Sequence, residues 1–120
     1  MQNGQISPKA SVAGVQSTRL LSDQWACIIA RIINDLRAFA IVTSVALAEE
    51  LNRRGIPTLR DGTWHRTTVD NLLRRYANFR RVNPDLVAQT LVKPPAELLE
   101  FIARKQTEHL KRQRHLRDPA

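Results

Sequence analysis

Arginine is concentrated in one part of the chain, and its chemistry there points to a polyanion. The segment from residue 53 to residue 81 holds eight arginines against two aspartates, Asp61 and Asp70, a net charge of +6. Guanidinium groups bind phosphate oxygens through paired N–H donors, and a basic block inside a folded region is typical of proteins that bind nucleic acids. A solvated surface is the plainer interpretation, because charge also serves solubility. The residues between these arginines must show which interpretation applies, nucleic-acid binding or a solvated surface.

Residue types that serve catalysis or metal binding occur without the partners that they need. The serines have no positioned base in the pattern, and Ser44 is better placed as a helix cap. His109 and His115 are six residues apart, which places them on opposite sides of a helix rather than together on a metal. Cys27 lies among apolar residues, where a buried side chain is expected. We therefore expect no enzymatic activity, no cofactor, no metal and no small-molecule substrate.

The composition places these residues in a small helical protein. The chain has 120 residues, 42% of them hydrophobic and 25% charged, with a net charge of +8, which suffices for one modest core. Cys27 is the only cysteine, so an internal disulfide is excluded and a reducing compartment is favoured. No apolar run approaches the roughly 18 residues of a membrane span, and the first residues lack the apolar region of a secretory signal. We expect a cytoplasmic protein that makes no contact with membranes.

The first half of the chain contains the elements that must position the arginines. Residues 1–20 are predicted to form a flexible leader, since they are rich in small polar residues without periodicity. Ser22 and Asp23 are predicted to cap a helix over 24–39. Its apolar residues, spaced three or four apart, should form one buried stripe: Trp25, Ile28, Ile29, Ile32, Ile33, Leu36 and Phe39.

Two further helices follow, joined by a connector that contains glycine. Thr43 and Ser44 are predicted to cap a helix over 45–54, with Leu47, Ala48 and Leu51 on its inner face. Gly55 should end that helix in the left-handed conformation, with help from Asn52, and Asp61-Gly62 should form a tight turn. The third helix is predicted over about Arg66–Tyr76, with Val69, Leu72, Leu73 and Tyr76 turned toward the core.

The last part of the chain, residues 82–120, is expected to be helical and basic. A short helix is predicted over 85–91, and Pro94-Pro95 should open a last helix that runs through Ile102. From Arg104 onward the segment is predicted to fray into a basic tail. The fold class is therefore all-α, with a leader at 1–20, a helical core at 21–81 and a C-terminal segment at 82–120.

The stretch from Ala46 to Arg75, ALAEELNRRGIPTLRDGTWHRTTVDNLLRR, carries a recognisable motif. It closely resembles the helix-turn-helix in the recombinase domain of serine recombinases of the resolvase and invertase type. The positions in register are Leu47-Ala48, Leu51-Asn52, Gly55-Ile56-Pro57-Thr58, Gly62, Trp64, Thr68-Val69 and Leu72-Leu73. The resemblance implies a helix-turn-helix at about 43–76 that binds double-stranded DNA, although its joint exceeds the usual three- to four-residue turn.

In a helix-turn-helix the last helix lies in the major groove, and its N-terminal part contacts the bases. Trp64 is expected to close over Leu51 and Ile56 and so fix the angle of that helix. Arginine binds guanine and asparagine binds adenine through two hydrogen bonds. The predicted base contacts are His65, Arg66, Thr67, Asp70 and Asn71. The predicted phosphate contacts, which give affinity without sequence preference, are Arg53, Arg54, Arg60, Arg74 and Arg75.

Two positions in this set depart from what the motif favours. Asp70 is acidic where a phosphate contact would be basic, so it accepts from cytosine, pairs with Arg66 or Arg74, or weakens the site. His65 stands where the family often has serine or threonine, and it is a poorer helix cap.

The resemblance also defines what is missing. Serine recombinases cut DNA with a separate N-terminal catalytic domain that carries a Tyr-x-Arg-x-Ser motif, and this motif is absent here. We therefore expect a bacterial or phage-type DNA-binding protein of the nucleoid, either a regulator or a non-catalytic piece of a mobile-element recombinase involved in DNA recombination.

Two other functions remain open from the sequence. The apolar stripes of the first and last helices suit a protein-interaction or assembly protein, and both a monomer and a homodimer agree with them. The basic segment from Arg104 to Arg117 suits a nonspecific nucleic-acid binder, although aromatic residues for stacking on RNA bases make up only 5% of the chain.

Overall fold

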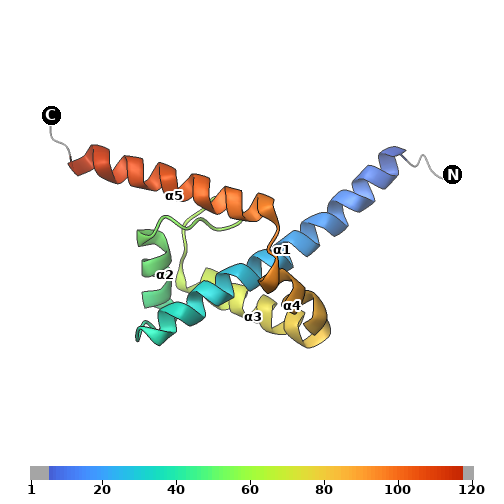
Figure 1. The fold of residues 1–120 in the computed structure, drawn as a ribbon, viewed down its shortest axis with the longest axis horizontal. Helices are drawn as coiled ribbons and strands as arrows, with labels where there is room; N and C mark the ends of the chain where they lie inside the picture. The colour runs from blue at the N-terminus through green and yellow to red at the C-terminus, as the bar shows by residue number, and fades with distance from the viewer. Residues whose placement is uncertain (1–5, 118–120) are drawn as a thin grey trace.

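The computed structural model describes residues 6–117, and the side chains of residues 19–116 within them. Helices α1 (Ile6–Ala38), α2 (Ser44–Arg53), α3 (Arg66–Val82), α4 (Pro84–Val92) and α5 (Ala96–Arg117) follow one another, without a strand between residues 6 and 117. The first turns of α1 and the last turns of α5 extend away from the body on opposite sides (Figure 1). The all-α fold class predicted from the sequence is confirmed.

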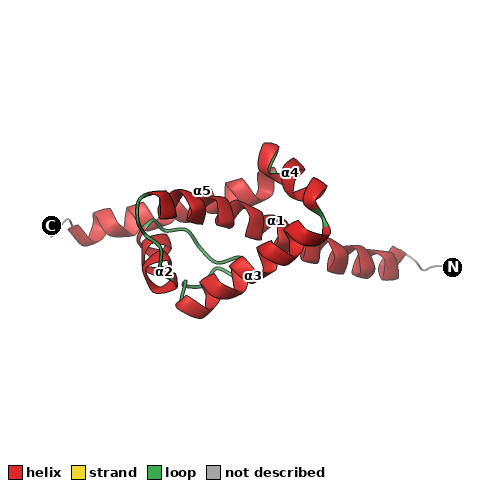
Figure 2. Ribbon diagram, turned by 90° about the horizontal axis from the view of Figure 1, so that it is seen from below, coloured by secondary structure: helices red, strands yellow, loops and turns green. Residues whose placement is uncertain are grey.

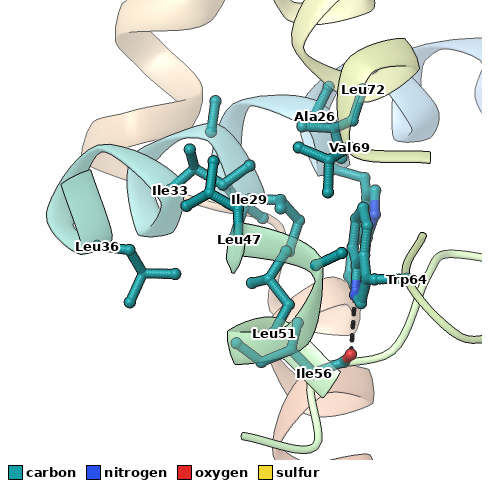
Figure 3. Close-up of a cluster of buried hydrophobic side chains, with 14 of the residues drawn as sticks. Ala26, Ile29, Ile33, Leu36, Leu47, Leu51, Ile56, Trp64, Val69 and Leu72 are labelled. Carbon is teal, nitrogen blue, oxygen red and sulfur yellow. Dashed lines mark hydrogen bonds between the residues drawn. The ribbon is translucent and has the colours of Figure 1, made fainter. Parts of the chain in front are cut away.

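The core joins four helices, and the segment between α2 and α3, around one cluster of apolar side chains (Figure 3). Ile29 and Ile33 of α1 and Leu47 and Leu51 of α2 are fully buried, and Val69 of α3 closes the cluster from the other side. Each such side chain contributes about 1.5–3 kcal/mol by leaving water. Leu98 and Ile102 bring α5 into the same cluster. The tilted ring of Phe101, 5.8 Å from that of Trp25, adds a second contact between α5 and α1.

A smaller cluster holds α4 against the rest. Cys27, Phe79 and Val87 are buried together, and they come from α1, α3 and α4. Phe79 lies beyond the end predicted for the third helix, which continues to Val82 rather than stopping near Tyr76. The helix extends because Phe79 adds another buried position at helical spacing, and Pro84 begins the next helix.

The helix predicted over 24–39 starts much earlier. Residues 6–20 of the expected leader belong to α1, and residues 1–5 lie outside the described part of the chain. Ser22 and Asp23 therefore lie inside a helix and do not cap it. The Asp23 carboxylate instead accepts a hydrogen bond from Arg75 Nε at 2.7 Å, which ties α1 to α3.

The far end of α1 differs from the prediction as well. Phe39 was expected in the buried stripe, but 78% of it is exposed. The helix ends at Ala38, so Phe39 lies beyond its last residue, and the chain then turns at Ala40, which has a positive φ of 70°. The other stripe residues are buried or half-buried as predicted.

The last helix is longer than predicted too. Instead of fraying from Arg104, α5 stays helical to Arg117. Its first half packs on the core, and the second half extends beyond it (Figure 1). The basic side chains of this segment are therefore carried on a helix.

Candidate nucleic-acid interface

The connector between α2 and α3 has no regular secondary structure, yet it is held at several points. Trp64 is 2% exposed, and its indole N–H donates to the Ile56 carbonyl at 2.9 Å (Figure 3). The Asn52 amide donates to the Trp64 carbonyl and accepts from the Trp64 N–H, both at 2.8 Å. The prediction that Trp64 closes over Leu51 and Ile56 is confirmed, whereas Asn52 holds the connector and does not cap its own helix.

The end of α2 uses glycine for two reasons. Gly55 has a φ of +73°, and the N–H of Ile56 donates to the Leu51 carbonyl at 3.1 Å, the pattern of a left-handed helix end. A Cβ built on Gly55 would lie 2.5 Å from the Cβ of His109, so a larger residue would collide with α5 as well. The prediction of a left-handed Gly55 is confirmed.

Helix α5 binds the end of α2 and the connector from the outer side. Gln106 Nε2 donates to the Arg54 carbonyl at 3.2 Å, and His109 Nε2 lies 2.9 Å from the Arg53 carbonyl. Both bonds satisfy carbonyls at the end of α2 that have no partner within the helix. Lys105 Nζ is 2.8 Å from an Asp61 carboxylate oxygen, and this hydrogen bond raises the pKa of Lys105. The turn predicted at Asp61-Gly62 lies slightly earlier, with Leu59 and Arg60 at its centre, and a 2.9 Å bond from the Asp61 N–H to the Thr58 carbonyl closes it.

The first turn of α3 faces solvent, as predicted for base contacts. His65, Arg66, Thr67 and Asn71 are exposed, while Asp70 is half-buried. His65 is the N-cap with extended backbone and forms no side-chain cap bond, in agreement with its expected weakness as a cap.

Asp70 serves to join the two helices. Its carboxylate accepts a hydrogen bond from the Ser44 hydroxyl at the start of α2, and Arg66 Nε is 3.8 Å away. Of the roles left open for Asp70, the structure shows the pair with Arg66 and adds Ser44, which was expected only as a cap. Thr43 is the cap, since its hydroxyl accepts from the Ala46 N–H at 3.1 Å.

The arginines predicted to contact phosphate fall into two groups. Glu50 accepts hydrogen bonds from both Arg53 and Arg54, which lower the pKa of its carboxyl to about 2. Arg75 is held by Asp23 on α1. Arg60 and Arg74, by contrast, are exposed and have no carboxylate partner among the side chains that the structure describes. Of the five predicted phosphate contacts, these two carry a charge that no described carboxylate compensates.

The structure adds residues that sequence reasoning missed. Lys105, Gln106 and His109 hold the connector from α5, although the segment was expected to fray. Their spacing of one to four residues was a helical signal, but nothing in the sequence showed which turn of the chain they meet. Asn78 and Arg81 lie on the exposed side of α3, in the part beyond the predicted helix end.

The thiol of Cys27 is buried in the described part of the chain. Burial raises the pKa of the Cys27 thiol to about 11, so it stays protonated near neutral pH and a poor nucleophile. Between residues 6 and 117, no helix combines the length and apolar character that crossing a membrane requires. Within the same residues, no three His, Cys, Asp or Glu side chains are grouped to hold a metal ion.

Comparisons of the chain with protein-family models, with curated proteins and with solved structures found no match in any of the three. The likeness to serine recombinases therefore rests on the residues of the motif between 46 and 75.

Proposed function

We propose that the protein binds double-stranded DNA through its α2–α3 helix-turn-helix, with α3 in the major groove. It acts in the bacterial nucleoid as a regulator, or as a non-catalytic accessory protein derived from a recombinase. It has no enzymatic activity of its own, and a homodimer on paired half-sites is the form in which modules of this size commonly act.

The observation that carries the proposal is the rigid connector next to an exposed α3. A helix can distinguish bases only when its angle to the DNA is fixed, because the hydrogen bonds that select a base pair depend on direction. Asn52 and Trp64 provide this fixation from within the motif, and α5 reinforces it from outside. The exposed first turn of α3 lies directly after the connector.

The position of α3 in the molecule also supports the proposal. Its buried side packs on α1 and α2 through Val69 and Leu72, so its opposite side is free. In the view from below, α3 lies along the outer edge of the helical body, with no helix beyond it (Figure 2).

Binding of the purified protein to a random-sequence duplex pool at two salt concentrations tests the proposal. We expect a steep loss of affinity with salt, because bound arginines release counterions from the phosphates. Sequences recovered from the bound fraction should share a motif. Arg66→Ala should weaken binding by about 1–3 kcal/mol and relax that motif.

A matched pair of variants separates phosphate contact from general charge. Arg60→Ala should lower the salt slope by about one, whereas Lys93→Ala, which removes a charge outside the motif, should leave it unchanged. Absence of binding at both salt concentrations, or binding that salt does not affect, would contradict the proposal.

One observation favours a second candidate, a protein-interaction module. Phe39, Val42 and Val45 are 78%, 60% and 52% exposed at the corner between α1 and α2. Neighbouring exposed apolar side chains of this kind often mark a protein contact. Sedimentation of the wild type and of Phe39→Ser tests this candidate: a dimer that the substitution dissociates would support it, and a monomer in both cases would count against self-assembly.

A further inference from the structure

The exposed side of α3 carries a stripe of only three residue types. Five residues spaced three or four apart share this side, and all are exposed. They are Thr67, Asn71, Arg74, Asn78 and Arg81, here called the outer stripe. The opposite side holds the buried Val69, Leu72 and Phe79. The outer stripe is therefore the part of α3 that is most distant from the core.

Four of these residues form two couplets of the same kind. Arg74 Nη1 donates to Asn71 Oδ1 at 3.1 Å, and Arg81 Nη2 donates to Asn78 Oδ1 at 2.8 Å. Each arginine follows its asparagine by three residues, and the second couplet follows the first by seven. Two turns of helix thus separate them.

The arginines of the couplets differ from Arg66 and Arg75 in their partners. Arg66 lies near the Asp70 carboxylate and Arg75 is bonded to Asp23, so part of their charge is compensated. Arg74 and Arg81 have no carboxylate partner among the described side chains, where each guanidinium donates instead to an asparagine.

We propose that the two couplets contact bases in two windows of the major groove, three base pairs apart. This inference rests on the proposed function; it assigns base contacts to Asn78 and Arg81, and it moves Arg74 from the predicted phosphate contacts to the base contacts. Seven residues of α-helix rise about 10.5 Å, and three base-pair steps of DNA rise about 10 Å. The repeat of the couplets therefore matches a repeat of the DNA when α3 runs along the DNA axis, so that base contacts extend beyond the N-terminal part of the helix, where a helix-turn-helix usually makes them.

The chemistry of the couplets suits this role. Arginine pairs with the O6 and N7 of guanine, and asparagine with the N6 and N7 of adenine. The amide oxygen has two lone pairs, so it can accept from the arginine and from an adenine amino group together. The arginine bond restricts the asparagine rotamer before DNA arrives, which lowers the entropy lost on binding.

Selection from the random-sequence duplex pool, performed with three variants, tests the inference. The double variant Asn78→Ala/Arg81→Ala should lose the sequence preference at one end of the wild-type motif and keep it three base pairs away. Its affinity for the wild-type site should fall about 10-fold or more, since each bidentate pair discriminates about 5- to 150-fold and the variant removes two of them. Asn71→Ala/Arg74→Ala should lose the other end.

Arg80→Ala is the matched control, because it removes a charge from the same turn of α3 away from the outer stripe. Arg80 lies over the Tyr76 ring, 5.8 Å from its centroid, and the variant should keep the complete motif. Alanine favours the helix at these exposed positions, and circular dichroism melting should show folded variants.

Two outcomes would overturn the inference, and they are distinguishable. If the wild type binds with a steep salt dependence and Asn78→Ala/Arg81→Ala retains the complete motif and affinity, the second window does not exist while the proposed function stands. If the wild type itself does not bind duplex DNA, the proposed function fails and this inference fails with it.

Discussion

Helices α1 and α2 end in the same backbone geometry but in different surroundings. At the end of α1, the N–H of Ile41 donates to the Leu36 carbonyl at 3.1 Å, and Ala40 has a φ of 70°. At the end of α2, the N–H of Ile56 donates to the Leu51 carbonyl at the same distance, and Gly55 has a φ of 73°. One left-handed position holds alanine and the other holds glycine.

The surroundings explain which end tolerates a side chain. Gly55 lies under α5, where a Cβ would meet His109, and the neighbouring Ile56 carbonyl is bonded to Trp64. Ala40 is exposed, so its methyl group costs only backbone strain. The comparison shows that the end of α2 is held by contacts with α5 and Trp64, whereas the end of α1 is an exposed turn.

The largest loss of stability should come from removing the Trp64 side chain, which packs against the end of α2. Trp64→Ala should lower the free energy of unfolding by about 3–5 kcal/mol, because it leaves a cavity and an unpaired Ile56 carbonyl. Chemical denaturation measures this loss. Trp64→Phe keeps most of the ring volume and should cost less, and equal losses for both variants would show that the hydrogen bond rather than packing holds the connector.

Gly55→Ala should have the next largest effect. The left-handed conformation and the collision with α5 together should lower the free energy of unfolding by about 2–4 kcal/mol. Gly62→Ala is the matched control in the same connector, since its Cβ would meet only the Thr58 hydroxyl at 3.2 Å. Similar denaturation midpoints for the two variants would refute the special role of the α2 end.

The opposite substitution at the end of α1 should stabilise the protein. Ala40→Gly removes the strain at φ 70° and should raise the free energy of unfolding by about 0.5–1 kcal/mol, part of which the greater freedom of glycine in the unfolded chain offsets. Thermal melting should show a small rise in Tm. A fall in Tm would mean that the Ala40 methyl group contributes contacts that outweigh the strain.

The smallest expected effect concerns the charges on the last turn of α2. The pKa of Glu50 lies near 2 because Arg53 and Arg54 donate hydrogen bonds to its carboxylate, below the value of about 4.3 for an unfolded chain. The stabilisation from this group is therefore complete above about pH 4.5 and is lost as the pH falls toward 2. Denaturation of wild type and Glu50→Gln over that range should show their difference shrinking on acidification, and a constant difference would contradict it.

Much of the fold followed from local pattern. Thr43 as a cap, Gly55 as a helix end and the buried stripes of α1 and α2 were predicted because each depends on residues close in sequence. Local sequence patterns did not predict the lengths of α3 and α5 correctly. No strong stop signal near Tyr76 or Arg104 ended α3 or α5, and their true ends depend on packing with distant helices.

The site was predictable in part, for a related reason. Exposure of the first turn of α3 followed from the apolar spacing on its other side. The sequence did not predict which arginines form ion pairs. Asp23 and Arg75, for example, are far apart in the sequence and meet only because α1 packs on α3. The bonds from α5 to the connector were equally hidden, because they join residues that only the folded chain brings together.

The fastening of α2 by α5 has a consequence for synthesis on the ribosome. The carbonyls of Arg53 and Arg54 and the Asp61 carboxylate find their partners at Lys105, Gln106 and His109, which are translated much later. A nascent chain that already contains α2, the connector and α3 therefore still lacks the bonds that complete the joint. Because domains fold as units while they emerge, the connection between α2 and α3 is completed only after α5 has left the ribosome.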